Sequence, residues 1–166
     1  METLITGIHH VTAVSGNAKE NINFYTGILG LRLVKKTVNF DDPNTYHFYF
    51  GDEAGRPGTI MTTFPYGNSL QMGRHGKGKI NTTAFSLPSG SLDYWQRRLK
   101  KYHIPFKHPQ QRFGNEVFVY LEDYDGLGIE LVFSEKEKRE GYSFNKNIPE
   151  EHSIRHSSCG NVGGSI

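Results

Sequence analysis

Cysteine is almost missing from this sequence, which has one thiol, Cys159, in 166 residues. A single thiol cannot form an internal disulfide, so no disulfide framework stabilises the fold, and a reducing compartment suits it. Long apolar runs are missing as well, because no window reaches the roughly 18 residues that a membrane span needs. We therefore expect a soluble, cytoplasmic protein without a membrane partner.

Charge of one sign is not concentrated anywhere along the chain. The 19 lysines and arginines and 17 acidic residues leave a formal net charge of +2, without a run of five basic residues. The sequence therefore lacks the cluster of basic residues that is typical of a nucleic-acid-binding protein. The GxSxG, P-loop, GxGxxG and CxxC motifs are absent too, which excludes the usual hydrolase, nucleotide-binding and thiol-redox classes. A small, neutral ligand fits this composition better.

The same order of predicted strands and helices occurs twice in the chain. In the first unit, residues 5–65, a strand leads into an amphipathic helix that begins after Asn17 and stops at Gly30, and three strands follow. These elements are expected at residues 5–14, 17–30, 32–40, 46–51 and 59–64. The second unit, residues 79–134, repeats the order at 80–87, 88–102, 105–108, 116–121 and 127–133. The sequence therefore predicts an α+β fold of two βαβββ modules whose strands form a curved mixed sheet around a ligand-binding cup.

The composition changes after residue 134. A run of charged residues at 135–140 leads into a polar stretch that ends in a Gly/Ser-rich tail at 157–166. We expect residues 1–134 to form the domain and residues 135–166 to be a charged linker and tail. A linker with no domain after it indicates either a truncated chain or a tail that docks elsewhere.

The pair His9-His10 on the first strand is the main chemical signal. Imidazole is a common ligand of divalent iron, manganese and zinc. Because adjacent residues on a strand face opposite sides, at most one of the two is expected to enter the cup. His10 shares its face with Thr12, whose hydroxyl could bond a metal-bound water or a substrate oxygen, so His10 is the better ligand candidate. The alternative is a hydrogen-bonded structural histidine.

Glu130 is the second signal, since it interrupts an otherwise apolar strand. A buried carboxylate needs a metal, a cation or hydrogen bonds, which makes Glu130 a candidate metal ligand. The alternative is that Glu130 lies on the solvent face of an amphipathic edge strand. The other histidines considered lack ligand spacing and are expected in surface or turn positions: His47, His75, His103 and His108.

Several segments together resemble one known family. They are GIHHVTAVSG (7–16), FYTGILGLRLVKKTVNFDD (24–42), TYHFYFGDEAGRPGTIMTTFP (45–65), GSLDYW (90–95), RFG (112–114) and IPEEHSIR (148–155). The sequence resembles the two-domain ring-cleaving dioxygenases of the vicinal oxygen chelate superfamily, in the hydroquinone dioxygenase branch related to glyoxalase and bleomycin-resistance proteins. The resemblance covers residues 5–155 and implies a glyoxalase-like fold.

The resemblance also implies a cofactor and roles for particular residues. Members of this family hold Fe(II) in a 2-His-1-carboxylate triad, and the match puts the first ligand at His10, with His9 and Thr12 supporting it. Fe(II), or Mn(II) in its place, would bind a hydroquinone- or catechol-like substrate and O2, and His9 could take the hydroxyl proton. The family's other two ligands belong to a second domain after the IPEEHSIR segment. We therefore expect this chain to have little or no dioxygenase activity alone.

Two other classes of protein stay open. A glyoxalase-type isomerase would share its metals between two subunits, but it needs inward carboxylates or histidines where strands 59–64 and 80–87 offer threonines. A bleomycin-resistance-like module would hold an aromatic ligand without a metal, so metal content separates it from the enzymes. In either case a homodimer, or the second domain, is expected to cover the exposed module faces.

Overall fold

The computed structural model describes residues 8–67, 80–112, 116–144 and 147–162. The first unit contains β1 (His10–Ser15), α1 (Ala18–Ile22), a π-helical turn (Asn23–Ile28), β2 (Arg32–Val38), β3 (Tyr46–Gly51) and β4 (Ile60–Pro65). The second contains β5 (Ile80–Pro88), a 3-10 turn (Ser89–Ser91), α2 (Leu92–Lys101), β6 (Gln110–Arg112), β7 (Glu116–Glu122) and β8 (Gly128–Ser134). A 3-10 turn (Glu150–His152) and β9 (His156–Val162) follow. The expected α+β class and the repeated βαβββ order are confirmed.

The strands form two sheets rather than one curved sheet. The first has the order β1-β4-β3-β2 and the second the order β6-β7-β8-β5-β9. Both are mixed, because β1 and β4 run parallel, as do β5 and β8, while the other pairs are antiparallel. The edge of β5 that does not pair with β8 pairs with β9 instead. No strand of the first sheet can therefore pair with β5.

The first helix begins and ends where the sequence predicts. The side chain of Asn17 accepts hydrogen bonds from the backbone N–H groups of Lys19 and Glu20, and Gly30 adopts the left-handed φ of +76° that stops the segment. Between them the helix changes from α to π at Asn23. The Thr26 hydroxyl donates to the Ile22 carbonyl at 2.7 Å, a side-chain bond that competes with the regular helical ladder.

The strand predicted at residues 105–108 is wrong. The β6 strand lies at Gln110–Arg112, after Pro109, and within the expected range Phe106 makes only an isolated bridge to Leu121. Pro105 and Pro109 have no N–H to donate to a sheet, so this stretch cannot form a continuous ladder.

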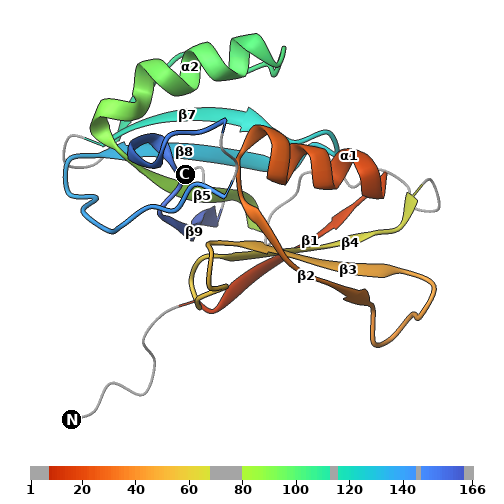
Figure 1. The fold of residues 1–166 in the computed structure, drawn as a ribbon. Helices are drawn as coiled ribbons and strands as arrows, with labels where there is room; N and C mark the ends of the chain where they lie inside the picture. Colours follow the sequence, from red (N-terminus) through yellow and green to blue (C-terminus); the bar gives the residue numbers. More distant parts are fainter. Residues whose placement is uncertain (1–7, 68–79, 113–115, 145–146, 163–166) are drawn as a thin grey trace.

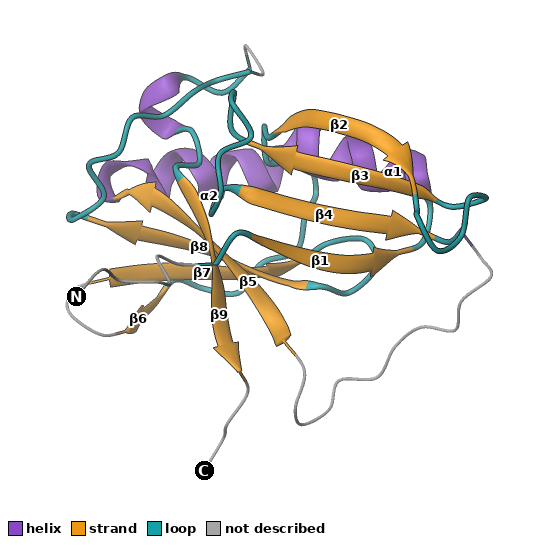
Figure 2. Ribbon diagram, turned by 90° about the horizontal axis from the view of Figure 1, so that it is seen from below, coloured by secondary structure: helices purple, strands orange, loops and turns teal. Residues whose placement is uncertain are grey.

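Both helices pack on the same side of the two sheets (Figure 1). Seen from below, the sheets lie in front of α1 and α2, so the helices cover only one face (Figure 2). Apolar side chains from both units fill the space between helices and sheets in one core that includes Phe24, Phe48, Phe50, Phe85, Trp95, Leu99, Leu131 and Phe133. Among the described residues, no helix is long and apolar enough to cross a membrane.

Part of the segment expected to be a linker is packed against both units. We call its described residues within 141–155 the strap. Ile148 is 2% exposed and lies against Gly30, and the buried Trp95 indole donates to the His152 carbonyl at 2.9 Å. The guanidinium of Arg98 donates to the carbonyls of Gly27, Ile28 and Asn147. These contacts make the strap a structural bridge between α2 and the first helix rather than a solvated linker.

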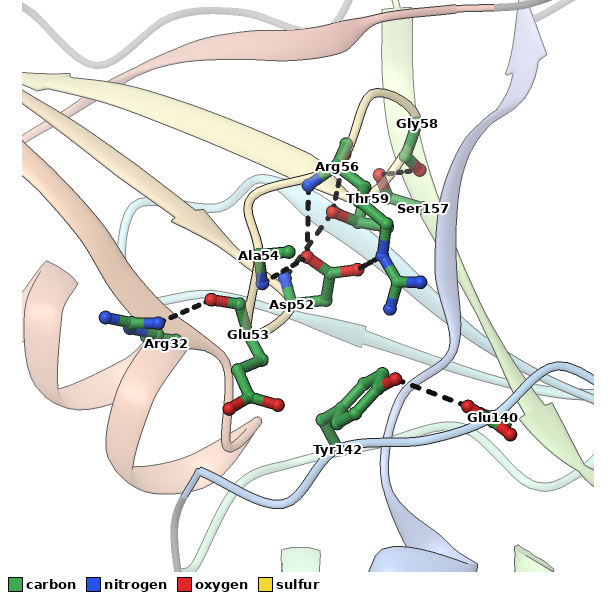
Figure 3. Close-up of polar contacts among 10 residues, drawn as sticks. All are labelled: Arg32, Asp52, Glu53, Ala54, Arg56, Gly58, Thr59, Glu140, Tyr142 and Ser157. Atoms are coloured by element: carbon green, nitrogen blue, oxygen red, sulfur yellow. Dashed lines mark hydrogen bonds and ion pairs between the residues drawn. The ribbon is translucent and has the colours of Figure 1, made fainter.

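The chain after the strap contacts the loop between β3 and β4 (Figure 3). Within this loop, Asp52 accepts hydrogen bonds from the backbone N–H groups of Ala54 and Arg56 and from Arg56 Nε. Ser157, the second residue of β9, donates to the Gly58 carbonyl through both its backbone N–H and its hydroxyl. The expected tail therefore connects the second sheet to the first unit.

Candidate metal-binding site

The face of the first sheet that points away from the helices carries the candidate residues. On β1, β4 and β3 the side chains of Val11, Met61 and Phe50 enter the core, and these three are paired across the sheet. Because side chains alternate along a strand, their neighbours Thr12, Thr62 and Tyr49 face the other way. We call the surface that carries these neighbours the open face. Thr12 and His10 are exposed on it.

His9 and His10 contact each other. Their Nδ1 atoms lie 3.0 Å apart, and the two rings meet edge to face with centroids 5.2 Å apart. The opposite orientation expected of adjacent strand residues does not hold for this pair, because β1 begins at His10 and His9 precedes it. One Nδ1 must donate a proton and the other must accept it, so the two imidazoles have different tautomers or one is protonated. In both rings Nε2 is the nitrogen not used in this contact.

Thr12 is held by a second threonine. The Thr62 hydroxyl donates to Thr12 Oγ1 at 2.8 Å, and the two residues are paired in the parallel register of β1 and β4. Thr62 is fully buried, whereas Thr12 is exposed. The Thr12 hydroxyl proton is therefore free to point from the open face.

His47 also lies near this face, although the sequence analysis assigned it to the surface or a turn. It is half-buried on β3, and its Nδ1 lies 3.1 Å from the hydroxyl of Tyr49. Partial burial lowers the pKa of His47, and the nearby charges of His10 and Lys35 lower it further. The alternation of HFYF could have shown this, because Phe48 and Phe50 are core residues and His47 and Tyr49 must share the opposite face.

Glu130 lies on the other sheet. It is 7% exposed on β8 and accepts a hydrogen bond from Arg112 Nη1 at 2.6 Å. The alternative of a solvent face on an edge strand is wrong, because β8 is flanked by β7 and β5. The carboxylate is buried as expected, and a cation does compensate it, but that cation is the guanidinium of Arg112.

The described residues contain no group of three or more histidine, cysteine, aspartate or glutamate side chains that could hold a metal. His10, with Nε2 unengaged and Nδ1 oriented by His9, fits the role of one ligand. Three other histidines considered from the sequence do not add to it: His103 has a left-handed φ in an exposed turn, His108 is exposed, and His75 lies outside the described residues. The residues present therefore fit part of a metal site.

Comparison with known proteins places the chain in a family. Residues 7–131 match the model of the "Glyoxalase/Bleomycin resistance protein/Dioxygenase superfamily". The chain is 46% identical over 144 residues to the protein named "Putative ring-cleaving dioxygenase MhqO" from Bacillus subtilis (strain 168), covering 87% of this chain and 45% of that protein. It is 36% identical over 129 residues to the "Chlorohydroquinone/hydroquinone 1,2-dioxygenase" of Sphingobium indicum, covering 77% of this chain and 40% of that protein.

A crystal structure of a dioxygenase from Bacillus subtilis, described as putative, has the same fold. It superposes with a TM-score of 0.83 at 44% identity, covering 91% of this chain and 47% of the other. The chain thus spans about half the length of the curated relatives it matches. From the match over residues 7–131, the chain belongs to the glyoxalase/bleomycin resistance protein/dioxygenase superfamily.

Proposed function

We propose that this chain forms one wall of the active site of an Fe(II)-dependent dioxygenase that cleaves hydroquinone- or catechol-like rings with O2. The observation that carries the proposal is the contact of His9 with His10 at the open face, with Nδ1 atoms 3.0 Å apart and no hydrogen bond to His10 Nε2 from any described residue. A histidine ligand whose second nitrogen is oriented by a neighbour is the usual arrangement in metal sites. The names of the relatives support the reaction class.

Each residue of the wall has a distinct task in this proposal. His10 supplies one imidazole ligand, and His9 fixes its ring orientation and tautomer through the Nδ1 contact. With His10 Nε2 kept for the metal, His10 Nδ1 donates to His9 Nδ1, so neutral His9 carries its own proton on Nε2. His9 therefore takes the proton of the aromatic hydroxyl at Nδ1, once its contact with His10 is released. Thr12, positioned by Thr62, hydrogen-bonds a substrate oxygen. Fe(II) would supply the Lewis-acid and redox chemistry toward the hydroxyl and O2.

The other ligands must come from outside this face. Glu130 is on the second sheet and is paired with Arg112, so its role as a ligand would require that ion pair to break. We propose instead that a second glyoxalase-type unit covers the open face, a position that a second copy of the 166-residue chain can also take. Two exposed apolar side chains, Val14 on β1 at 56% and Ile8 just before β1 at 49%, favour such a cover.

The test is an anaerobic calorimetric titration of the chain with Fe(II) and with Mn(II). His10→Ala should weaken binding by more than about 10-fold, because a ligand is lost. His108→Ala, which removes an exposed imidazole from a loop, should not change the affinity. Glu130→Gln is expected to retain binding, since Arg112 already occupies the carboxylate.

Two results would contradict the proposal. Equal affinities for the wild-type chain and His10→Ala would remove His10 as a ligand and leave a metal-free binding module as the better description. Loss of binding in Glu130→Gln but not in His10→Ala would move the metal to the second sheet. Because the described residues lack a complete set of ligands, we expect little ring cleavage by the metal-loaded chain alone, and oxygen uptake with hydroquinone and with catechol checks this.

A further inference from the structure

Hydroxyl groups form a row across the open face, leading away from His10. Thr12 on β1 pairs with Thr62 on β4, and Thr62 pairs with Tyr49 on β3. Neighbouring strands lie about 4.8 Å apart, so the row brings the backbone of Tyr49 to about 10 Å from that of Thr12. The far end of the row is Lys35 on β2, paired with Tyr49 and with its Nζ 5.5 Å from the Tyr49 ring centroid.

The tyrosine in this row is fixed by its neighbour on the same face. The Tyr49 hydroxyl lies 3.1 Å from His47 Nδ1, and the two ring centroids are 4.2 Å apart. The His47 ring also packs on Phe64 of β4, at a centroid distance of 4.0 Å. His47 thus contacts two aromatic rings, and its hydrogen bond fixes the position of the Tyr49 hydroxyl.

The hydrogen bonding of this pair is incomplete among the described residues. A tyrosine hydroxyl can both donate and accept, and the contact with His47 uses one of these capacities. His47 Nε2 is buried without a hydrogen-bond partner. Orphaned buried polar atoms are uncommon in folded proteins and are concentrated where a ligand or an ordered water completes the network. The half-buried Tyr49 hydroxyl is the member of the pair that a ligand on the open face can reach.

We propose that Tyr49 binds the second hydroxyl of a hydroquinone-type substrate and that His47 is a positioning residue that holds the Tyr49 hydroxyl in place. This inference rests on the proposed function, because it takes the first hydroxyl to lie near His10. Phe64 offers an aromatic surface beside the polar row, against which the substrate ring can pack. The pair therefore selects rings that carry an oxygen at both ends.

The experiment compares two ligands that differ by one hydroxyl, hydroquinone and phenol, by chemical-shift titration of the metal-free, ¹⁵N-labelled 166-residue chain. The wild-type chain should bind hydroquinone more tightly than phenol. Tyr49→Phe should raise the dissociation constant of hydroquinone about 3- to 10-fold, the loss expected for one hydrogen bond, and leave that of phenol unchanged. Tyr46→Phe, on the same strand, is the matched control.

His47 is tested through its effect on Tyr49. His47→Ala should abolish the preference for hydroquinone, whereas His47→Asn keeps a hydrogen-bonding atom near the position of Nδ1 and should restore most of it. The ¹⁵N shifts of His47, which report its tautomer, should change when hydroquinone binds and stay constant with phenol. A merely structural role would leave these shifts unaffected.

The outcomes separate this inference from the proposed function. The inference is overturned if the wild-type chain does not bind hydroquinone, or if Tyr49→Phe keeps the preference for hydroquinone over phenol. It is also overturned if Tyr49→Phe changes the dissociation constant of hydroquinone no more than the Tyr46→Phe control does. A lower affinity for Fe(II) or Mn(II) in His47→Ala would also overturn it, because His47 would then be a ligand. If His10→Ala leaves metal binding unchanged while the hydroquinone preference depends on Tyr49, the proposed function fails and the inference about ring recognition stands.

Discussion

At the scale of single residues, Asp123 shows how a buried carboxylate connects the two units. It is 8% exposed and lies in the turn between β7 and β8. Its Oδ2 accepts a hydrogen bond at 3.0 Å from the hydroxyl of Tyr25, which belongs to the first helix. The backbone N–H groups of Asp125 and Leu127 also donate to it. Burial raises the pKa of Asp123, and these hydrogen bonds only partly offset that effect. The folded state therefore holds a proton on this carboxyl more strongly than the unfolded chain does.

The consequence is a pH dependence with a definite sign. A raised folded-state pKa contributes stability below the unfolded pKa of about 4, and that contribution is lost as the pH rises through the folded value. Asp123→Asn keeps an acceptor for the two backbone donors and removes the titration. Urea unfolding between pH 3.5 and 8 should show the free energy of unfolding shifting in favour of the variant as the pH rises. A difference that is constant, or that falls with pH, would contradict this.

Residues of the candidate site differ in how far the sequence alone indicates them. His10 could be proposed from the chain, because an imidazole beside a second imidazole at the start of a strand is a metal-ligand signal in itself. For His47 the alternation along β3 indicates its face and its neighbour Tyr49, but its packing on Phe64 of β4 has no local signal. The ion pair of Glu130 was missed for the same reason, since Arg112 is 18 residues away on another strand.

At the scale of elements, the strap differs most from the prediction. Its charged and polar composition is typical of a solvated linker, yet Ile148 and Ile154 pack against the core. Ile148 lies directly against the backbone of Gly30. One isoleucine in a polar stretch has no periodicity, so no pattern could have indicated that it is buried. Glycine at position 30 serves two purposes, because its positive φ ends the helix and its missing Cβ leaves room for Ile148.

The strap is expected to be part of the cooperative fold. Ile148→Ala should lower the free energy of unfolding by about 2–4 kcal/mol, as for other large-to-small changes of a buried isoleucine. Glu151→Ala, at an exposed position in the same segment, should change it by less than about 0.5 kcal/mol. Denaturant unfolding followed by circular dichroism measures both. Equal, small effects would mean that the strap is not packed in solution.

At the scale of the whole molecule, one sheet is exposed on the side where the candidate ligand lies. The helices cover the opposite side of both sheets (Figure 2). The described residues supply one well-placed histidine and no complete set of ligands. If a second unit completes the site, metal binds the associated form more tightly than the single chain. Metal binding then stabilises the association, and association strengthens metal binding.

We therefore expect metal to change the mass of the particle in solution. Light scattering after size exclusion should move from the 18.8 kDa of one chain toward twice that value when Fe(II) or Mn(II) is added anaerobically. His10→Ala should not respond, and His108→Ala should respond like the wild type. Association that does not depend on metal, or that persists in His10→Ala, would show that the second unit does not complete the metal site.

The sequence by itself determined the repeated βαβββ order, the start and end of the first helix, and His10 as a ligand candidate. These features depend on period-two alternation, a capping Asn17, the conformational freedom of Gly30 and the chemistry of imidazole, all of which are local. Only the tertiary structure decided that β9 pairs with β5, that Arg112 neutralises Glu130, and that Phe64 packs on His47. Each of these depends on contacts between residues far apart in the chain, and such contacts leave no regular spacing in the sequence.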